Sequence, residues 1–219
     1  MKYKLYIFDF DGTLVNTGEG IKKALEVFED KLKLKHFPKE KAGFIVGPPI
    51  KESIARTHPE LDKEKLEEYS LLFDECYDEV LLYGVEEYKG IHEVLDMIHE
   101  YGAYVTIDTA KLERQAVRCL EKCNLKEKID LLEAWSKGTN KTQLIKKVID
   151  SYDIPKDQII AIGDSHFDGE AANANGIDFI AVKYGYGFGL FDDEKIYNPK
   201  YVVNSVDELK ELIKSFFNE

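Results

Sequence analysis

Short apolar runs that each stop at small or acidic residues recur along this 219-residue chain, and segments of helical periodicity lie between them. Runs of this length suit strands that are buried on both faces of a sheet. Because strands alternate with helices, the pattern predicts an α/β fold with a doubly wound, parallel sheet. The predicted strands are residues 4–10, 103–107, 158–162, 178–182 and, more weakly, 201–203. The helical patterns of this core run through residues 91–98, 112–123, 144–149 and 206–216.

The interval between the first two predicted strands is much longer than a crossover connection, which needs about a dozen residues or somewhat more. Residues 17–87 carry helical periodicity, with turns predicted at Gly47-Pro48-Pro49 and His58-Pro59 and no convincing strand. The sequence therefore predicts a core domain of residues 1–16 and 88–219, interrupted by a small all-helical domain at 17–87.

The charge balance limits the partners of this chain. Thirty Lys and Arg residues against 42 Asp and Glu give a formal net charge of −12, so a general electrostatic surface for nucleic acid is not expected. No segment approaches the roughly 20 apolar residues of a membrane span, and aspartates interrupt the apolar N-terminal run too early for a signal peptide. The three cysteines, Cys76, Cys119 and Cys123, favour buried reduced thiols. We expect a cytoplasmic monomer or homodimer that binds neither nucleic acid nor membrane.

Carboxylates follow two of the predicted strands. Asp9 and Asp11 end the first strand, with side chains on the same side of an extended chain. Asp164 and Asp168 follow the strand at 158–162. Ligands of open parallel sheets bind beyond the carboxyl ends of the strands, and like charges this close repel unless a cation lies between them. Oxygen ligands with positions left for water and phosphate favour Mg²⁺ over Ca²⁺ or zinc.

The same edge of the sheet offers groups that can hold an anionic substrate. Backbone amides around Phe10, Asp11 and Ala110, in tight turns after strands, can form an anion-binding concavity. Thr109 adds a hydroxyl, and Lys141 adds the point charge with which lysine binds phosphate. The sequence thus indicates a site where a metal ion and a phosphate group meet.

Four segments resemble, in this order, the four motifs of the haloacid dehalogenase superfamily: DFDGT, DTAK, the lysine before an amphipathic helix in GTNKTQLIKKVI, and GDSHFD. The resemblance extends from residue 4 to about residue 206. The helical insertion resembles the C1 type of cap, and FIVGPPIKES and KYGYGFG are similar to segments of phosphoglycolate phosphatase-like members. The resemblance implies a Rossmann-like core under a cap and a phosphatase activity.

This resemblance implies roles for the motif residues. Asp9 corresponds to the nucleophile that forms an aspartyl-phosphate, and Asp11 to the general acid and base. A carboxylate nucleophile of this type splits phosphoryl transfer into two steps. The residues implied to hold the phosphoryl group are Gly12, Thr109, Ala110 and Lys141.

The resemblance also implies a metal site. Mg²⁺ is the implied cofactor, held by Asp9, Asp164 and the backbone carbonyl of Asp11. Asp168 and Ser165 are implied to support these ligands from behind. Metal and lysine together would offset the charge of the transferring phosphoryl group.

Three positions depart from the family pattern. Asp108 stands where an apolar or small residue is commoner, and it adds negative charge beside the phosphate site. Ala110 stands where Asn or Ser is commoner, and Asn16 where Asp is often found. None of them removes a central residue, but the first two bear on substrate preference and rate.

Several side chains keep more than one interpretation. Thr109 is compatible with a helix cap as well as a phosphate contact, and Lys141 with a solvated lysine. Lys111 is equally compatible with a contact near the phosphate and with a surface charge, and His166 is interpreted as a loop histidine rather than a metal ligand. The residues whose roles stay open are Lys51, Arg56 and Trp135.

The sequence therefore predicts a Mg²⁺-dependent phosphatase that hydrolyses a small phosphorylated metabolite beneath a helical lid. Phosphoglycolate is the first guess for the substrate, by resemblance. Asp11 and Asp164 argue against a dehalogenase of the same superfamily, which needs only the first aspartate and no metal. The alternatives are a phosphomutase with the same core residues and a catalytically idle protein that binds a phosphorylated ligand.

Overall fold

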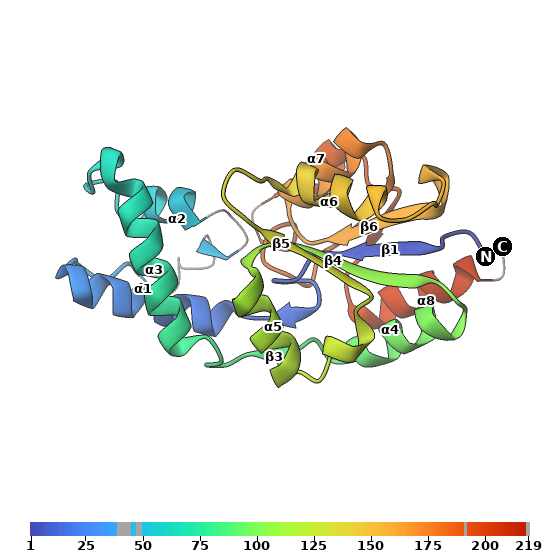
Figure 1. Cartoon of the computed structure of the whole chain (residues 1–219), viewed down its shortest axis with the longest axis horizontal. Helices are drawn as coiled ribbons and strands as arrows, with labels where there is room; N and C mark the ends of the chain where they lie inside the picture. Colours follow the sequence, from blue (N-terminus) through green and yellow to red (C-terminus); the bar gives the residue numbers. More distant parts are fainter. Residues whose placement is uncertain (39–44, 47–49, 191, 218–219) are drawn as a thin grey trace.

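A sheet of parallel strands organises the larger part of the chain. The computed structural model describes residues 1–38, 45–46, 50–190 and 192–217 (Figure 1). Within them, six strands form the sheet: β1 (Leu5–Phe8), β4 (Tyr104–Leu112), β5 (Leu131–Trp135), β6 (Ile159–Gly163), β7 (Asp178–Val182) and β8 (Tyr201–Val203). Their order is β5-β4-β1-β6-β7-β8, so β1 pairs with β4 on one side and with β6 on the other. The predicted α/β class with a doubly wound parallel sheet is confirmed.

Helices cover both faces of this sheet. They are α4 (Ile91–Glu100), α5 (Glu113–Lys122), α6 (Lys141–Asp150), α7 (His166–Asn175) and α8 (Val206–Phe216). Tyr6 and Phe8 of β1 belong to the hydrophobic cluster that includes α4 and α8, while Leu5 and Ile7 belong to the cluster of α6 and α7. Alternate β1 side chains thus pack on opposite helix layers. Figure 1 shows these helices on the two faces of the sheet. Short 3-10 helices are η2 (Lys63–Lys65), η3 (Lys126–Lys128), η4 (Lys156–Gln158) and η5 (Glu194–Tyr197).

A second group of helices lies at one end of the molecule (Figure 1). It consists of α1 (Gly18–Leu32), α2 (Ile50–Thr57) and α3 (Leu66–Val80), and α3 packs against both of the others. Phe28 of α1 is fully buried in this group, with its ring centroid 5.9 Å from that of Phe73 on α3. Among the described residues, no helix is both long and apolar enough to cross a membrane.

A two-stranded ribbon ties the two ends of this helical segment together. β2 (Val15–Asn16) pairs antiparallel with β3 (Glu86–Glu87). The expectation of no strand within 17–87 is therefore wrong at its last two residues. Glu86 and Glu87 carry no apolar alternation, so only backbone pairing reveals the strand. The division into a core of 1–16 and 88–219 and an inserted domain stays a prediction.

Two strands of the main sheet also differ from expectation. β4 continues beyond the predicted end at residue 107 as far as Leu112, so the segment DTAK lies within the strand. The interpretation of Thr109 as a helix cap is wrong, because α5 begins only at Glu113. β5 was not predicted, since LLEAW has partly buried side chains at the edge of the sheet and no clear alternation.

Other local predictions have mixed outcomes. The chain turns at His58-Pro59 as predicted, where the N–H of Leu61 donates to the carbonyl of His58 (3.1 Å). The turn predicted at Gly47-Pro48-Pro49 lies outside the described residues. The three cysteines are free and buried, as predicted.

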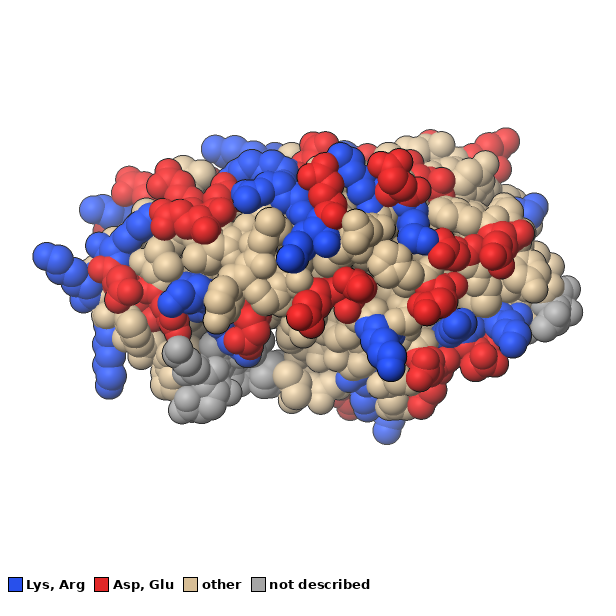
Figure 2. Space-filling model, turned by 90° about the horizontal axis from the view of Figure 1, so that it is seen from below, with Lys and Arg blue, Asp and Glu red and all other residues tan. Residues whose placement is uncertain are grey.

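Acidic and basic side chains are intermingled over the face of the molecule drawn in Figure 2. Proteins that bind nucleic acid usually gather Lys and Arg on one face. On the part of this face that the structure describes, basic groups lie beside acidic ones. The absence of a nucleic-acid partner stays a prediction.

Candidate active site

The carboxyl ends of β1 and β6, neighbouring strands at the centre of the sheet, bring three predicted carboxylates together. Asp9 follows β1 directly, and Asp164 and Asp168 follow β6. All three are buried, and one oxygen of each lies within 4.8 Å of the others. Ligands of open parallel sheets bind in the crevice at this edge. The cluster of Asp9, Asp164 and Asp168, called here the carboxylate cluster, can hold a metal ion.

Burial makes ionisation of these carboxyl groups costly. Burial raises the pKa of Asp9 well above its usual value, Lys141 lowers it, and the charges of Asp168 and Asp164 raise it again. Burial also raises the pKa of Asp164 to about 7, and Asp168 adds to that effect. A bound cation would lower the pKa values of these carboxyl groups, because it favours their ionised forms. An all-oxygen, negatively charged donor set thus fits a hard cation.

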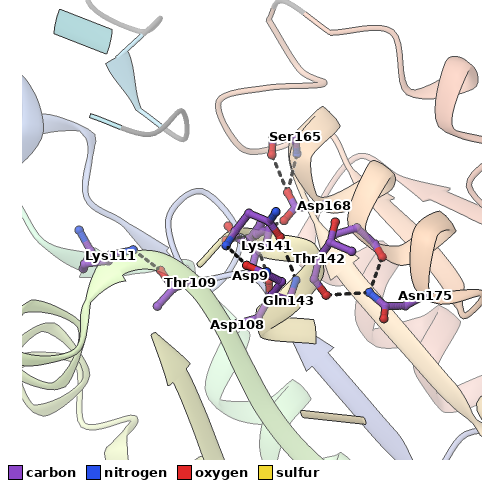
Figure 3. Close-up of polar contacts among 12 residues, drawn as sticks. Asp9, Asp108, Thr109, Lys111, Lys141, Thr142, Gln143, Ser165, Asp168 and Asn175 are labelled. Atoms are coloured by element: carbon purple, nitrogen blue, oxygen red, sulfur yellow. Dashed lines mark hydrogen bonds and ion pairs between the residues drawn. The ribbon is translucent and has the colours of Figure 1, made fainter. Parts of the chain in front are cut away.

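Lys141 places a positive charge in the carboxylate cluster. Its ammonium contacts the carboxylates of Asp9 and Asp168 (Figure 3). It also lies 3.7 Å from Oδ2 of Asp108. The interpretation of Lys141 as a solvated lysine is wrong, because its side chain is only 10% exposed.

The start of α6 fixes the position of Lys141, the first residue of that helix. Oδ1 of Asn140 accepts a hydrogen bond from the N–H of Gln143 (3.0 Å), and Oε1 of Gln143 accepts one from the N–H of Asn140 (2.9 Å). This reciprocal capping box satisfies two backbone donors and determines where the helix begins. Lys141 therefore enters the site from a rigid element.

Asp168 and Ser165 form an equivalent box at the start of α7. Oδ2 of Asp168 accepts hydrogen bonds from the N–H of Ser165 (2.9 Å) and from its Oγ (2.7 Å). The other oxygen of Asp168 is left for Lys141. The interpretation of His166 as a loop residue is wrong, since His166 begins α7 and its Nδ1 pairs with Asp192 (2.8 Å).

Asp164 is held by the glycine-rich segment after β7. Its Oδ2 accepts hydrogen bonds from the N–H groups of Tyr186 (2.5 Å) and Gly187 (3.2 Å). Gly12, with φ of +92°, lies against the same carboxylate, and a Cβ there would overlap it. The structure thus brings Gly12 to Asp164. Tyr186 and Gly187 were missed as site residues, although KYGYGFG is the signal that could have found them.

Asp11 lies beside the carboxylate cluster and has its own partners. Its Oδ1 lies 3.1 Å from Nζ of Lys111 and accepts a hydrogen bond from Oγ1 of Thr17. Nζ of Lys111 donates to the hydroxyl of Tyr77 on α3 (2.8 Å) and lies 4.4 Å from the centroid of that ring. The interpretation of Lys111 as a surface charge is wrong, because the residue is buried. Thr17 and Tyr77 were missed as site residues, because no local sequence pattern marks either of them.

The segment DTAK contributes three further residues. Thr109 is buried, and its Oγ1 accepts a hydrogen bond from the N–H of Lys111 (3.1 Å). Thr109 and Ala110 both line the cavity described next. Asp108 is buried with no hydrogen bond to its Oδ2 among the described residues, and burial raises its pKa to about 7 while Lys141 lowers it. The carboxyl group expected beside the site is therefore present, but with this raised pKa it is only partly ionised near neutral pH.

A cavity of about 310 Å³ opens from these residues toward α3. The residues on its core side include Asp9, Asp11, Lys111, Lys141, Asp164 and Ser165, in addition to Thr109 and Ala110. Of the residues with open roles, Lys51 and Trp135 line it. Arg56 pairs instead with Glu52 on α2. This volume suits a small molecule.

Known proteins resemble this chain in sequence and structure. Residues 6–182 match the family described as haloacid dehalogenase-like hydrolase. The pyrophosphatase PpaX of Halalkalibacterium halodurans is 28% identical, over 97% of this chain and 98% of that protein. The phosphoglycolate phosphatase of Chromobacterium violaceum is 27% identical, over 97% of both chains. The crystal structure of a predicted phosphatase from Clostridium acetobutylicum superposes with a TM-score of 0.85 at 28% identity, over 98% of this chain and 100% of that one.

Loss of the α6 cap is expected to disturb Lys141. Asn140→Ala should lower the free energy of unfolding by about 0.5–2 kcal/mol and the kcat for p-nitrophenyl phosphate by about tenfold or more, since a small displacement of a positioned group is costly. Ser205→Ala is the matched control, because Ser205 caps α8, outside the site. It should lose similar stability and keep full activity. Equal activities of the two variants would refute the positioning role.

Proposed function

We propose a two-step hydrolysis on the premise that this chain belongs to the haloacid dehalogenase-like hydrolase family and is a hydrolase that acts on phosphate esters. In this proposal the chain is a Mg²⁺-dependent phosphatase of a small phosphorylated metabolite, and Asp9 forms an aspartyl-phosphate. The observation that carries the proposal is the carboxylate cluster with Lys141 inside it, on the core side of a cavity.

In the first step, a carboxylate oxygen of Asp9 attacks the phosphorus atom, and the bond from phosphorus to the alcohol oxygen breaks. Asp11 gives its proton to that leaving oxygen. In the second step, water attacks the aspartyl-phosphate, Asp11 takes a proton from the water, and inorganic phosphate leaves as the Asp9 carboxylate is restored. Lys111 and Thr17 both contact Oδ1 of Asp11 and hold its carboxyl group beside the cavity, so Oδ2 would be the oxygen that carries the transferred proton.

Asp9, Asp164 and the backbone carbonyl of Asp11 would hold the Mg²⁺ ion, and Asp168 would support it from the same cluster. Three buried carboxylates against the single ammonium of Lys141 leave negative charge that a divalent cation can balance. When bound, Mg²⁺ offsets the repulsion between the Asp9 carboxylate and the phosphoryl group.

The phosphoryl group would be held by neutral and positive groups on the core side of the cavity. Thr109 offers its hydroxyl, and the backbone amides near Gly12 and Ala110 offer hydrogen bonds. Lys141 would balance the charge that develops on the transferring oxygens. Phosphoglycolate and pyrophosphate, which appear in the names of two relatives, are the compounds against which other phosphate esters should be compared.

Removal of the nucleophile is expected to abolish turnover. Asp9→Asn should lower kcat for phosphate release from p-nitrophenyl phosphate by about 10³-fold or more. The matched control is Asp207→Asn on the exposed first turn of α8, which should keep wild-type activity. Hydrolysis by the Asp9 variant at the wild-type rate would contradict the mechanism. Released inorganic phosphate, rather than an isomerised ester, distinguishes a phosphatase from a phosphomutase.

Removal of divalent cations is expected to stop the reaction reversibly. EDTA should reduce phosphate release to background, because the carboxylate cluster would then repel the substrate. Added Mg²⁺ should restore the rate, and Ca²⁺ should restore less, since it accepts a looser coordination geometry. Activity that is unchanged in chelator would rule out the metal role.

A further inference from the structure

One wall of the cavity is a stripe of side chains on α3. Ser70, Phe73, Asp74 and Tyr77 are spaced three and four residues apart, so they share one face of the helix. All four line the cavity. The proposed phosphate site lies on the core side, around Lys141. The organic part of a bound ester would therefore meet this α3 stripe.

Apolar side chains dominate the space between the α3 stripe and the core. Ile21 of α1 and Phe73 line it from the helical side, while Leu112 at the end of β4 and Trp135 at the end of β5 line it from the core. Pockets of this kind bind organic groups by burying apolar surface. A substrate with at least one apolar face would bind more tightly by burying that face against this lining.

The cations that line the cavity within the described part of the chain already contact carboxylates. Lys141 lies in the carboxylate cluster. Lys111 pairs with Asp11 at 3.1 Å. Lys51 contacts Glu67, and its side chain is 47% exposed. A second anionic group on a substrate would have to displace one of these pairs to find a positive partner.

Asp74 adds a negative charge to the α3 stripe. Burial raises its pKa to about 6, and Arg114 lowers it, so the carboxyl group is mainly ionised above neutral pH. A carboxylate in the cavity wall repels a second anion. It also accepts hydrogen bonds from hydroxyl and amine groups, with an ammonium forming the stronger bond.

We propose that the substrate is a phosphate monoester whose organic part has an apolar face and a hydroxyl or amine group for Asp74, and no second anionic group. This inference rests on the proposed phosphatase function and narrows its substrate class. Phosphorylated amino alcohols with a hydrocarbon segment meet these requirements. Phosphoglycolate and pyrophosphate would bring a second negative charge toward Asp74.

The test compares three phosphonates of matched length that resist hydrolysis: 3-aminopropylphosphonate, 3-hydroxypropylphosphonate and 3-phosphonopropionate. Calorimetry on the wild-type protein with Mg²⁺ measures their binding without any turnover. The amino and hydroxy compounds should bind at least about tenfold more tightly than the carboxylate, because like charges are disfavoured at close range. Equal or tighter binding of 3-phosphonopropionate, or no binding of any of the three, would overturn the substrate class.

The role of Asp74 is tested with a variant and a neighbour on the same helix. Asp74→Asn should reduce the ratio of the two dissociation constants, that of 3-phosphonopropionate to that of 3-aminopropylphosphonate, by about threefold or more. Glu75→Gln is the matched control, since Glu75 is exposed on α3 and does not line the cavity, and it should keep the wild-type preference. An unchanged preference in the Asp74 variant would overturn the assignment. If the protein hydrolyses no phosphate ester at all, the proposed function is overturned instead.

Discussion

The site depends on one electrostatic constraint, which is the burial of several carboxylates at the ends of adjacent strands. Asp9 and Asp164 are brought together by the pairing of β1 with β6, so the sheet that stabilises the fold also creates the repulsion. Helix starts and loop amides offset it, through Lys141 at the start of α6 and through the backbone N–H groups that bind Asp164. A hard cation and a phosphate group complete the balance in the mechanism proposed.

The core chemistry was predictable from sequence because its residues directly follow apolar strands. DFDGT and GDSHFD each stand at a strand end, and the position of strands in a parallel sheet brings their ends to one edge. The partners of these residues were not predictable in the same way. Lys111 on β4 contacts Tyr77, which lies 34 residues away on α3, and no local pattern reports such a pairing. β5 was missed because an edge strand needs no strict apolar alternation.

In the proposed reaction, chemistry and selectivity come from different parts of the cavity. The core wall carries the groups that would act on phosphorus, whereas the α3 stripe would meet the rest of the substrate. Relatives with the same family motifs bear the names of different substrates, one a pyrophosphatase and one a phosphoglycolate phosphatase. In the proposed substrate class, substrate identity would depend on residues such as Asp74, whose position follows from how α3 packs and not from a motif.

The central claim is that phosphate passes through Asp9 before it reaches water. The stereochemical course at phosphorus tests it most directly, with an ester made chiral by sulfur and oxygen-isotope substitution and hydrolysed in labelled water. Each in-line displacement inverts the configuration. Two displacements, through an aspartyl-phosphate, should give inorganic thiophosphate with overall retention. Inversion would mean that water attacks the ester directly, and it would contradict the account.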